Sequence, residues 1–471
     1  MSKIGTNLIY QSSYQVLRIL MPIITIPIVS HALGADGIGQ YAYANSIAQY
    51  FVLITALGLP LYGTREIAKT EREENNLSKT FWTLEGFSLL LTLIVLPTYL
   101  VIGFVFKLGT LFLIQSLLII GTGLDISWFF MGLEDFKKVT IVNFLVQVIG
   151  FCLILFYIRS SDDLIIYTII LTIMSVLSST SLWFFIKDKI HFVKPRFLEM
   201  WQSLKSCVVL FVPQVAIVLY TNLNKTMLGI LDQPSSVGIF SNSLLVTTVF
   251  VTLISSVDTV LMPRATRLFH HEKYSEGYAM IKKVLDLEIY FTIAISAGIM
   301  AISKKLVPWF FGNSFEKMEL VLPILGLLVI AIPGGMTLSR QYLIPQGRIR
   351  EYNKSVYFGA VLSVCLNLFL IPVFGIMGAV FVSVLVEVII WVIRLLDFKK
   401  NTKFSYSWRQ ITLNSLSAIV MIFSIFFITQ GMPANLVTTI VQVLIGIFIY
   451  VVLTSLLRVN PVFSILKEMK K

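Results

Sequence analysis

Long apolar stretches of about 20 residues, separated by short polar segments, recur along the whole chain. A helix needs about 20 apolar residues to cross the hydrocarbon core of a bilayer. The alternating ten-residue pattern of outer-membrane barrels is absent, so we predict helices. Fourteen spans are predicted, at about 7–32, 38–62, 80–105, 109–131, 139–158, 164–186, 206–231, 237–262, 284–306, 319–338, 354–373, 376–397, 410–430 and 437–458. The sequence therefore predicts an all-α integral membrane protein.

The composition excludes most classes of soluble protein. Of the 471 residues, 56% are hydrophobic and only 13% are charged, and the mean hydropathy is +0.85. Soluble domains carry roughly 25% charged residues, about twice this share. The longest predicted loops have only about 20 residues, which leaves no room for an aqueous domain. A water-soluble enzyme is therefore a poor explanation of this chain.

Basic residues predict the orientation of the spans. With the N-terminus in the cytoplasm, 29 of the 37 Lys and Arg residues fall in cytoplasmic segments and five in external ones. Cytoplasmic loops of membrane proteins are enriched in Lys and Arg, and one missed span near the middle would destroy this bias. We therefore expect both termini in the cytoplasm. The net charge of +12 is explained by this distribution, and no nucleic-acid partner is expected.

Weak internal symmetry predicts two halves of six spans each. The run Ile38–Ala42 resembles Val237–Ser241, and each follows a Leu-Gly pair (Leu33-Gly34 and Leu228-Gly229) that we expect to close the preceding helix. Duplicated bundles of this kind are common in transporters. The predicted division is an N-terminal lobe at 1–200, a C-terminal lobe at 201–400, and two further spans with a cytoplasmic tail at 401–471.

The sequence contains no motif for a cofactor or a metal ion. It lacks the G-x-x-x-x-G-K-[ST] phosphate loop and the H-E-x-x-H zinc motif, so neither ATP hydrolysis nor metal catalysis is expected. The three cysteines each lie within a hydrophobic stretch and predict neither a disulfide framework nor a metal site.

Arg18 is the charge that lies deepest in the first span, near the predicted bilayer midplane. An ionisable group at that depth is costly and normally is paired or faces water. It belongs to a polar stripe at helical spacing, formed by Gln11, Tyr14, Arg18, Pro22 and Thr25. The functional interpretation is a cation lining an aqueous cavity. The alternative is a structural ion pair with a buried carboxylate such as Glu387.

Spans 2 and 7 carry comparable polar stripes. The candidates that we expect to line a shared wet lumen are Asn45 and Gln49 in span 2 and Gln214, Asn222 and Lys225 in span 7. Amide and hydroxyl groups of this kind can also join helices to one another. Lys225 lies nearer the outer boundary, where extending the amine to the interface is an equal alternative.

Two carboxylates are candidates for binding a coupling ion. Glu387 lies near the middle of span 12, where it could titrate if it faces a cavity. Asp258 lies within about two turns of the inner boundary, as do Asp125 and Glu288. At that depth, anchoring at the membrane interface is an alternative interpretation.

Four sequence runs carry a family resemblance. They are Leu59–Ala68 (LPLYGTREIA), Asp125–Phe136 (DISWFFMGLEDF), Asn224–Gly229 (NKTMLG) and Leu343–Arg348 (LIPQGR). Together they resemble the polysaccharide-repeat-unit flippases (Wzx-type) of the multidrug/oligosaccharidyl-lipid/polysaccharide exporter superfamily, over essentially the whole chain. The run around Asp125 and Trp128 is expected to fix the inner ends of helices.

The resemblance implies a fold and a function. It implies a V-shaped pair of six-helix lobes that works by alternating access. The implied partners are membrane lipid, a polysaccharide polymerase and glycosyltransferases. The implied cargo is an oligosaccharide on undecaprenyl pyrophosphate, moved to the outer leaflet of a bacterial cytoplasmic membrane by antiport with an ion. Arg18 would suit the pyrophosphate, because a guanidinium group binds phosphate through two parallel hydrogen bonds.

Three alternatives stay open at the level of sequence. A flippase for teichoic acid or another lipid-linked precursor would share every feature above. A cation-coupled multidrug exporter would favour carboxylates and aromatics in the lumen, whereas the deep charges here are mixed. A membrane polymerase or ligase would need an external loop with acid and base groups, and the external segment near 307–318 holds only Glu316 as an acid.

Overall fold

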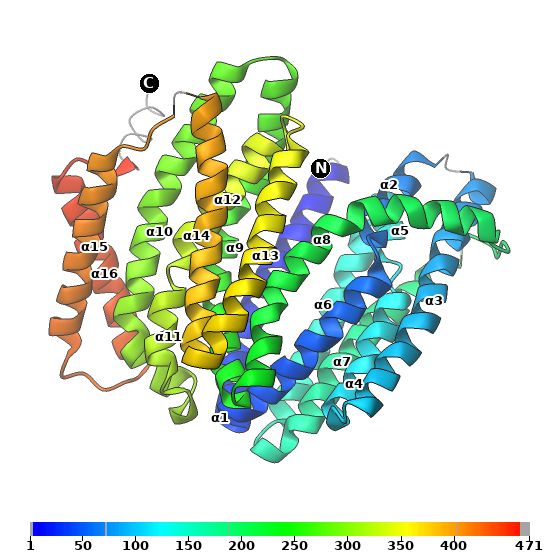
Figure 1. Ribbon diagram of the computed structural model, residues 1–471, viewed down its shortest axis with the longest axis horizontal. Coiled ribbons are helices and arrows are strands. Elements are labelled where there is room, and N and C mark those ends of the chain that lie inside the picture. Colours follow the sequence, from blue (N-terminus) through cyan, green and yellow to red (C-terminus); the bar gives the residue numbers. More distant parts are fainter. Residues whose placement is uncertain (1–2, 71–72, 188, 403, 462–471) are drawn as a thin grey trace. The chain divides into compact units, whose positions relative to one another are not determined.

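Helices make up every regular element in the residues that the computed structural model describes, which are 3–70, 73–187, 189–402 and 404–461 (Figure 1). Within these ranges, side chains are described at residue 21, at 23–205 and from 206 onward, with some exceptions between 206 and 220. The expected all-α fold class is therefore confirmed.

The chain divides into two units, Met1–Gly229 and Ile230–Lys471. The first unit holds α1 (Lys3–Ala56), α2 (Leu59–Lys69), α3 (Glu74–Val105), α4 (Gly109–Gly123), α5 (Ser127–Gly132), α6 (Phe136–Tyr157), η1 (Ser161–Asp163), α7 (Leu164–Ser181), η2 (Leu182–Phe185) and most of α8 (Phe197–Leu231). The second holds α9 (Pro234–His270), α10 (Tyr274–Phe310), η3 (Asn313–Phe315), α11 (Met318–Leu325), α12 (Leu328–Thr337), η4 (Leu338–Leu343), α13 (Ile349–Phe374), α14 (Ile376–Asn401), α15 (Trp408–Thr429) and α16 (Leu436–Leu456). The expected lobe boundary at residue 200 stays a prediction.

The helices have the length and composition of membrane spans. Within the described residues, twelve helical segments are long and apolar enough to cross a membrane. The long helix α1 covers two of the expected spans, and Gly34 separates them with a non-helical backbone (φ 66°, ψ 179°). Glycine tolerates a positive φ that strains other residues, so the chain can turn there. The protein is thus a multi-pass membrane protein.

Two expected spans are broken into pairs of helices. The span expected at 109–131 forms α4 and α5, with a gap at residues 124–126. The cause is local, because the Asp125 carboxylate accepts a hydrogen bond from the Ser127 backbone N–H at 2.9 Å and so replaces a helical bond. The span expected at 319–338 forms α11 and α12, which are separated at Gly326 and Leu327.

The first unit has an aromatic core at one end of its helices. Phe81 of α3 stacks on Trp128 of α5 with ring centroids 5.6 Å apart, and Phe129 meets Phe81 edge to face. All three side chains are buried, and α2 packs on the same core through Ile67. The motif around Trp128 therefore packs α5 against α2 and α3, and its expected role at the inner ends of helices stays a prediction.

In the second unit, α10 packs against α9, α11, α12, α15 and α16. The adjacent hairpin of α13 and α14 turns at Gly375, where φ is 54°. At Gly378, a Cβ atom would lie 2.3 Å from the Leu370 carbonyl oxygen, so glycine is required for this close approach. The last two helices, α15 and α16, thus join the unit through α10.

The expected role of Leu228-Gly229 in closing its helix is wrong. The pair lies inside α8, which continues to Leu231, the residue at which the span predicted at 206–231 ends. Gly229 instead serves close packing within the first unit, since a Cβ atom there would lie 1.9 Å from Cδ2 of Tyr43. The similarity of the two Leu-Gly pairs therefore does not extend to their local structure.

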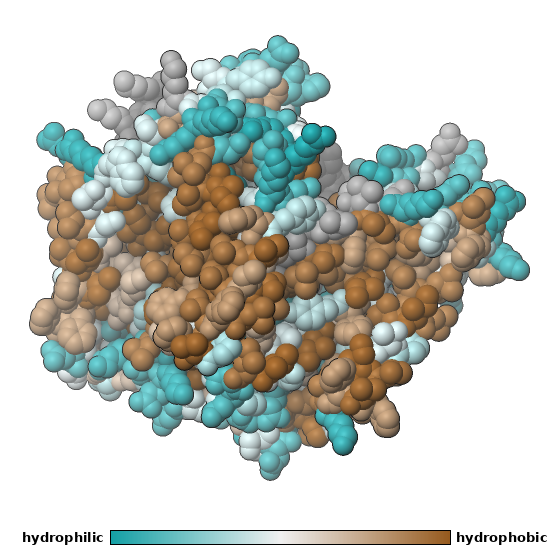
Figure 2. Space-filling view, viewed as in Figure 1, coloured by the Kyte–Doolittle hydropathy of each residue, from teal (hydrophilic) through white to brown (hydrophobic). Residues whose placement is uncertain are grey.

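The surface matches a bilayer environment. On the face that Figure 2 shows, hydrophobic side chains cover the middle of the helices and hydrophilic ones gather at the helix ends. Large apolar side chains such as Phe427 of α15 and Phe448 of α16 are 69% and 68% exposed. A soluble monomer rarely exposes contiguous apolar surface on this scale, whereas lipid accommodates it.

Candidate functional site

Two buried carboxyl groups meet inside the second unit. Asp258 of α9 and Glu288 of α10 lie on either side of Thr337, the last residue of α12. The Thr337 hydroxyl lies 2.7 Å from Asp258 Oδ1 and 2.6 Å from Glu288 Oε1. Asp258 and Thr337 are 0% exposed and Glu288 is 7% exposed. Both carboxyl groups are thus buried between three helices, which argues against the alternative interpretation that they anchor at the membrane interface.

The helix that carries Thr337 changes its geometry at this point. Residues Leu338–Leu343 form a π-helix, in which the Ile344 N–H bonds the Ser339 carbonyl five residues earlier at 2.9 Å. Within this turn, Gln341 donates its side-chain N–H to Asp258 Oδ1 at 2.6 Å. Single π turns inside helices are rare overall, and those that do occur are often found at functional sites.

The cluster formed by Asp258, Glu288, Thr337, Gln341 and Ser255 has more buried oxygen atoms than hydrogen-bond donors to serve them. Four of its buried oxygens have no hydrogen-bond partner within the described part of the chain, namely Asp258 Oδ2, Glu288 Oε2, Gln341 Oε1 and Ser255 Oγ. Arg340 lies beside them but directs its guanidinium to Thr259 Oγ1 at 3.1 Å and to the Ser255 carbonyl at 3.5 Å. A buried carboxylate without a compensating cation is costly, so this cluster is suited to take up a cation or a proton.

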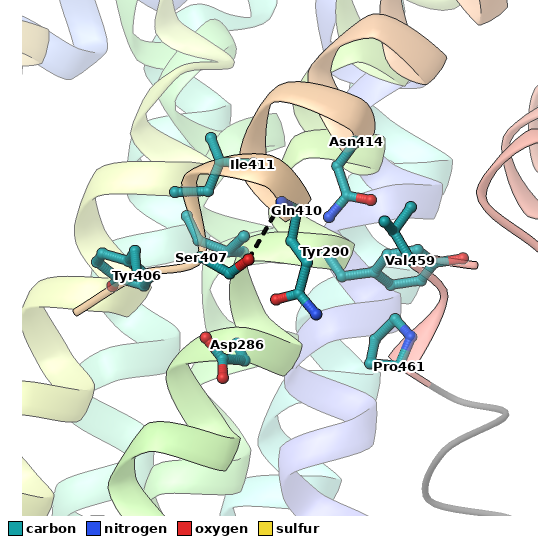
Figure 3. A pocket seen from close by; sticks show the side chains of 10 residues that line it. Asp286, Tyr290, Tyr406, Ser407, Gln410, Ile411, Asn414, Val459 and Pro461 are labelled. Carbon is teal, nitrogen blue, oxygen red and sulfur yellow. Dashed lines mark hydrogen bonds between the residues drawn. The ribbon is translucent and has the colours of Figure 1, made fainter. Parts of the chain in front are cut away.

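A small pocket with both polar and apolar lining residues opens beside α10 (Figure 3). Asp286, two residues before Glu288, lines it together with Tyr406, which precedes α15, and Gln410 in the first turn of α15. Tyr406 is close enough to interact electrostatically with both Asp286 and Glu288. Ser407 Oγ accepts a hydrogen bond from the Gln410 backbone N–H at 3.4 Å and so begins α15 at the rim of this pocket.

Polar residues of the first unit join helices to one another. Asn45 donates its amide to Gln115 Oε1 at 3.2 Å, and Gln115 is fully buried on α4. Tyr41 meets Tyr167 of α7 edge to face with ring centroids 5.2 Å apart. The structure thus shows Asn45 in contact with another helix, and contact between Asn45 and cargo stays a prediction.

The remaining predicted site residues are distributed over several helices. Asn222 donates its side-chain amide to the Val218 carbonyl of its own helix at 3.2 Å. Gln49 of α1, Lys225 of α8 and Glu387 of α14 are half-buried. The side chains of Gln11, Tyr14, Arg18 and Gln214 lie outside the described residues. Their proposed roles in a lumen stay predictions.

Sequence reasoning found only part of the buried cluster. It named Asp258 as an ion-coupling candidate, noted Glu288 only as a possible anchor, and did not consider Thr337 or Gln341. One usable signal was present, because Asp258 and Glu288 lie at similar depth on consecutive spans. Adjacent spans run in opposite directions and pack together, so two carboxyl groups at one depth can meet.

The fourth family run forms a separate ion pair. Arg348, which follows Gln346 and Gly347, donates Nη2–H to Asp397 Oδ1 of α14 at 2.8 Å. Its Nη1 lies 2.8 Å from Asp397 Oδ2 as an ion-pair contact and donates to the Tyr342 hydroxyl. These contacts hold the end of η4 against α14. The run is therefore structural in the described residues.

Comparison with known proteins assigns the family. The profile of the family described as "Polysaccharide biosynthesis protein" matches residues 4–269, more than half of the chain. The chain belongs to the polysaccharide biosynthesis protein family. It is 25% identical over 386 residues to a protein of Shigella dysenteriae named "Putative O-antigen transporter", an alignment that covers 79% of this chain and 94% of that protein. A protein of Escherichia coli (strain K12) with the same name is 22% identical over 404 residues, covering 84% and 96%.

Solved structures confirm the fold of this family member. The inward closed conformation of the lipid II flippase MurJ matches with a TM-score of 0.78 at 14% identity, over 96% of this chain and 98% of that one. An inward-facing multidrug resistance MATE family transporter of the MOP superfamily matches with a TM-score of 0.64 at 14% identity, over 81% and 94%. The expected MATE-like fold is thus confirmed, and the relatives are transporters rather than enzymes.

Proposed function

We propose that this protein is a flippase for a lipid-linked oligosaccharide that becomes part of a bacterial surface polysaccharide. It carries the repeat unit, attached to undecaprenyl pyrophosphate, from the inner to the outer leaflet of the cytoplasmic membrane. The observation that carries the proposal is the alignment with nearly the whole length of two proteins named as O-antigen transporters. The absence of a phosphate-loop motif from the sequence favours a driving force other than ATP hydrolysis within this chain.

The chemistry of the cargo explains the polar residues of the spans. A sugar unit and a pyrophosphate lose their hydrogen bonds to water when they enter hydrocarbon, so a transporter must replace them. We assign this role to the predicted lumen residues, with Arg18 and Lys225 as the cations for the pyrophosphate. The polyprenyl tail needs no such partners and can stay in lipid. Alternating access would then expose the lumen to each leaflet in turn.

An ion gradient is the proposed source of energy. Asp258 and Glu387 are the carboxylates that the sequence nominates for this coupling, and Asp258 lies in the buried cluster of the second unit. Antiport requires a group that binds the ion in one state of the transporter and releases it in the other. A polysaccharide polymerase and glycosyltransferases are the expected partners, because they consume and supply the cargo.

Deletion of the gene in its host tests the proposal. We expect the surface polysaccharide to be lost and its lipid-linked repeat unit to accumulate on the inner leaflet, and a plasmid copy to restore both. A deletion strain that keeps its polysaccharide but becomes sensitive to cationic drugs would replace the proposal with a multidrug exporter on the same fold. Sugar analysis of the lost polymer separates O-antigen or capsule from teichoic acid.

A further inference from the structure

The buried cluster of the second unit has a geometry that determines how many protons it holds. We propose that Asp258, Glu288 and Thr337 form a proton-binding site, in which one proton is shared by the two carboxyl groups through the Thr337 hydroxyl. The inference rests on the proposed function, because it names the ion and the groups for the coupling suggested there. It adds Glu288 and Thr337 to Asp258 as parts of one site.

Counting hydrogen atoms leads to this assignment. The contacts of Thr337 Oγ1 with Asp258 Oδ1 and Glu288 Oε1, at 2.7 and 2.6 Å, both have the length of an O–H···O hydrogen bond. A hydroxyl carries one hydrogen, so Thr337 can be the donor in only one of these two bonds. The second bond needs a hydrogen from a carboxyl group, with the hydroxyl oxygen as acceptor. Two ionised carboxylates would leave one short oxygen–oxygen contact with no hydrogen between the atoms.

Gln341 indicates which carboxyl group carries the proton. Its side-chain N–H lies 2.6 Å from Asp258 Oδ1 and can only donate. Asp258 Oδ1 therefore accepts from both Gln341 and Thr337, as an ionised carboxylate does. Glu288 is then the neutral partner, and its O–H donates to Thr337 Oγ1. Release of this proton would leave two negatively charged carboxylates separated only by the Thr337 hydroxyl. Their mutual repulsion disfavours loss of the proton in this state.

The groups around the pair do not neutralise both charges. From η4, Arg340 lies near Asp258 and bonds Thr259 and the Ser255 carbonyl instead. From α14, Arg394 donates to the Gly335 carbonyl at 2.8 Å, two residues before Thr337. The other titratable groups on this side are Asp286 and Tyr290 of α10, Tyr406 before α15, and Tyr450 of α16. In the described part of the chain, Arg340 forms no ion pair with Asp258 or Glu288.

A sodium ion is the competing ligand of the same oxygens. The four unpartnered oxygens of the cluster could serve as its ligands. The two short contacts through Thr337 argue against it, because the paired carboxyl oxygens are already joined by hydrogen bonds. An ion would have to break this chain of three oxygens before it could coordinate both carboxylates. The proposal therefore commits to the proton, and sodium becomes an outcome of the test.

Infrared difference spectroscopy on the purified full-length protein in phospholipid vesicles measures this proton directly. We expect a protonated-carboxyl band that disappears on titration to alkaline pH and is unaffected by added NaCl at constant pH. Glu288→Gln should remove it. Asp258→Asn should shift it without removing it, because the amide oxygen at that position can still accept from Gln341 and Thr337 while the Glu288 O–H still donates to Thr337. Thr337→Val, which keeps the shape of threonine without the hydroxyl, should shift the band, and Thr337→Ser should restore its position.

Glu85 provides a matched control. It is a second fully buried carboxyl group, on α3 of the first unit, and neither of its oxygens has a partner within the described residues. Glu85→Gln should leave the band of the pair unchanged. Size-exclusion chromatography and thermal unfolding verify that each variant is folded. If Glu288→Gln does not fold, the Thr337→Val and Thr337→Ser pair still decides the question.

Two results would overturn the proposal. One is a protonated-carboxyl band that Glu85→Gln leaves unchanged and that survives Glu288→Gln. The other is a change in the carboxylate bands on addition of NaCl at constant pH, which would make the cluster a sodium site. Neither measurement needs the cargo, so the site can fail while the flippase function stands, and the gene deletion can fail while the proton site stands.

Discussion

Gly63 of α2 lies directly against the indole ring of Trp128 of α5. A Cβ atom at Gly63 would be 2.6 Å from Cε3 and 2.8 Å from Cδ2 of that ring. The Thr64 hydroxyl also lies 3.3 Å from the Trp128 carbonyl oxygen. Two of the four family runs therefore meet at this contact, which holds α2 against the aromatic core of the first unit.

This contact predicts a stability effect at Gly63. Gly63→Ala should destabilise the protein, because overpacking against a buried ring costs about 1–3 kcal/mol and outweighs a gain of about 1 kcal/mol in helix propensity. The measurement is thermal unfolding of the purified protein. Gly298→Ala is the matched control, since no atom lies within 4 Å of a Cβ there, and it should be neutral or stabilising. Equal behaviour of the two variants would contradict the predicted close packing.

The pair Arg348–Asp397 predicts a second stability effect. Arg348→Ala should destabilise the second unit by about 1–3 kcal/mol, because it removes a charge-assisted hydrogen bond and an ion-pair contact from a largely buried carboxylate. Arg348→Lys should recover only part of this stability, since an ammonium group has a single nitrogen and cannot contact Asp397 and Tyr342 through two separate ones. A double-mutant cycle with Asp397→Asn measures the coupling. A coupling energy near zero would mean that the two residues act independently.

Arg18 predicts an effect on transport rather than on folding. Arg18→Ala should abolish surface polysaccharide while the protein is still found in the membrane at the normal level, because the proposed pyrophosphate partner is lost. Arg18→Lys should retain part of the transport if positive charge is what matters. Immunoblots of polysaccharide and protein from the same cells give both values. Normal polysaccharide in Arg18→Ala would remove this residue from the mechanism.

The excess of basic residues predicts the topology of the loops. A fluorescent protein fused after Glu272, between α9 and α10, should fluoresce, because that loop is expected in the cytoplasm. Alkaline phosphatase fused after Ser160 or Asn313 should be active, because those segments are expected outside. The opposite pattern at any of these positions would show that a span has been missed or wrongly added.

Local breaks within the spans were beyond the reach of the sequence pattern. The hydropathy of 109–131 is continuous, yet the Asp125 carboxylate bonds the Ser127 N–H and separates α4 from α5. Asn45 shows the same limit for side chains. Its position in a polar stripe predicted a lumen, whereas its amide bonds Gln115, 70 residues later in the sequence. A stripe of polar residues indicates which helix face avoids lipid, but does not identify what that face contacts.

The sequence by itself determined the class of this protein, its helical spans and the expected orientation of its loops. These follow from the length of apolar runs and the placement of Lys and Arg, which are local properties of the chain. Only the tertiary structure decided that Asp258, Glu288 and Thr337 meet. Their contact depends on how α9, α10 and α12 are rotated about their axes and on their relative depth. That arrangement results from packing over each whole helix, so no pattern around any one of the three residues specifies it.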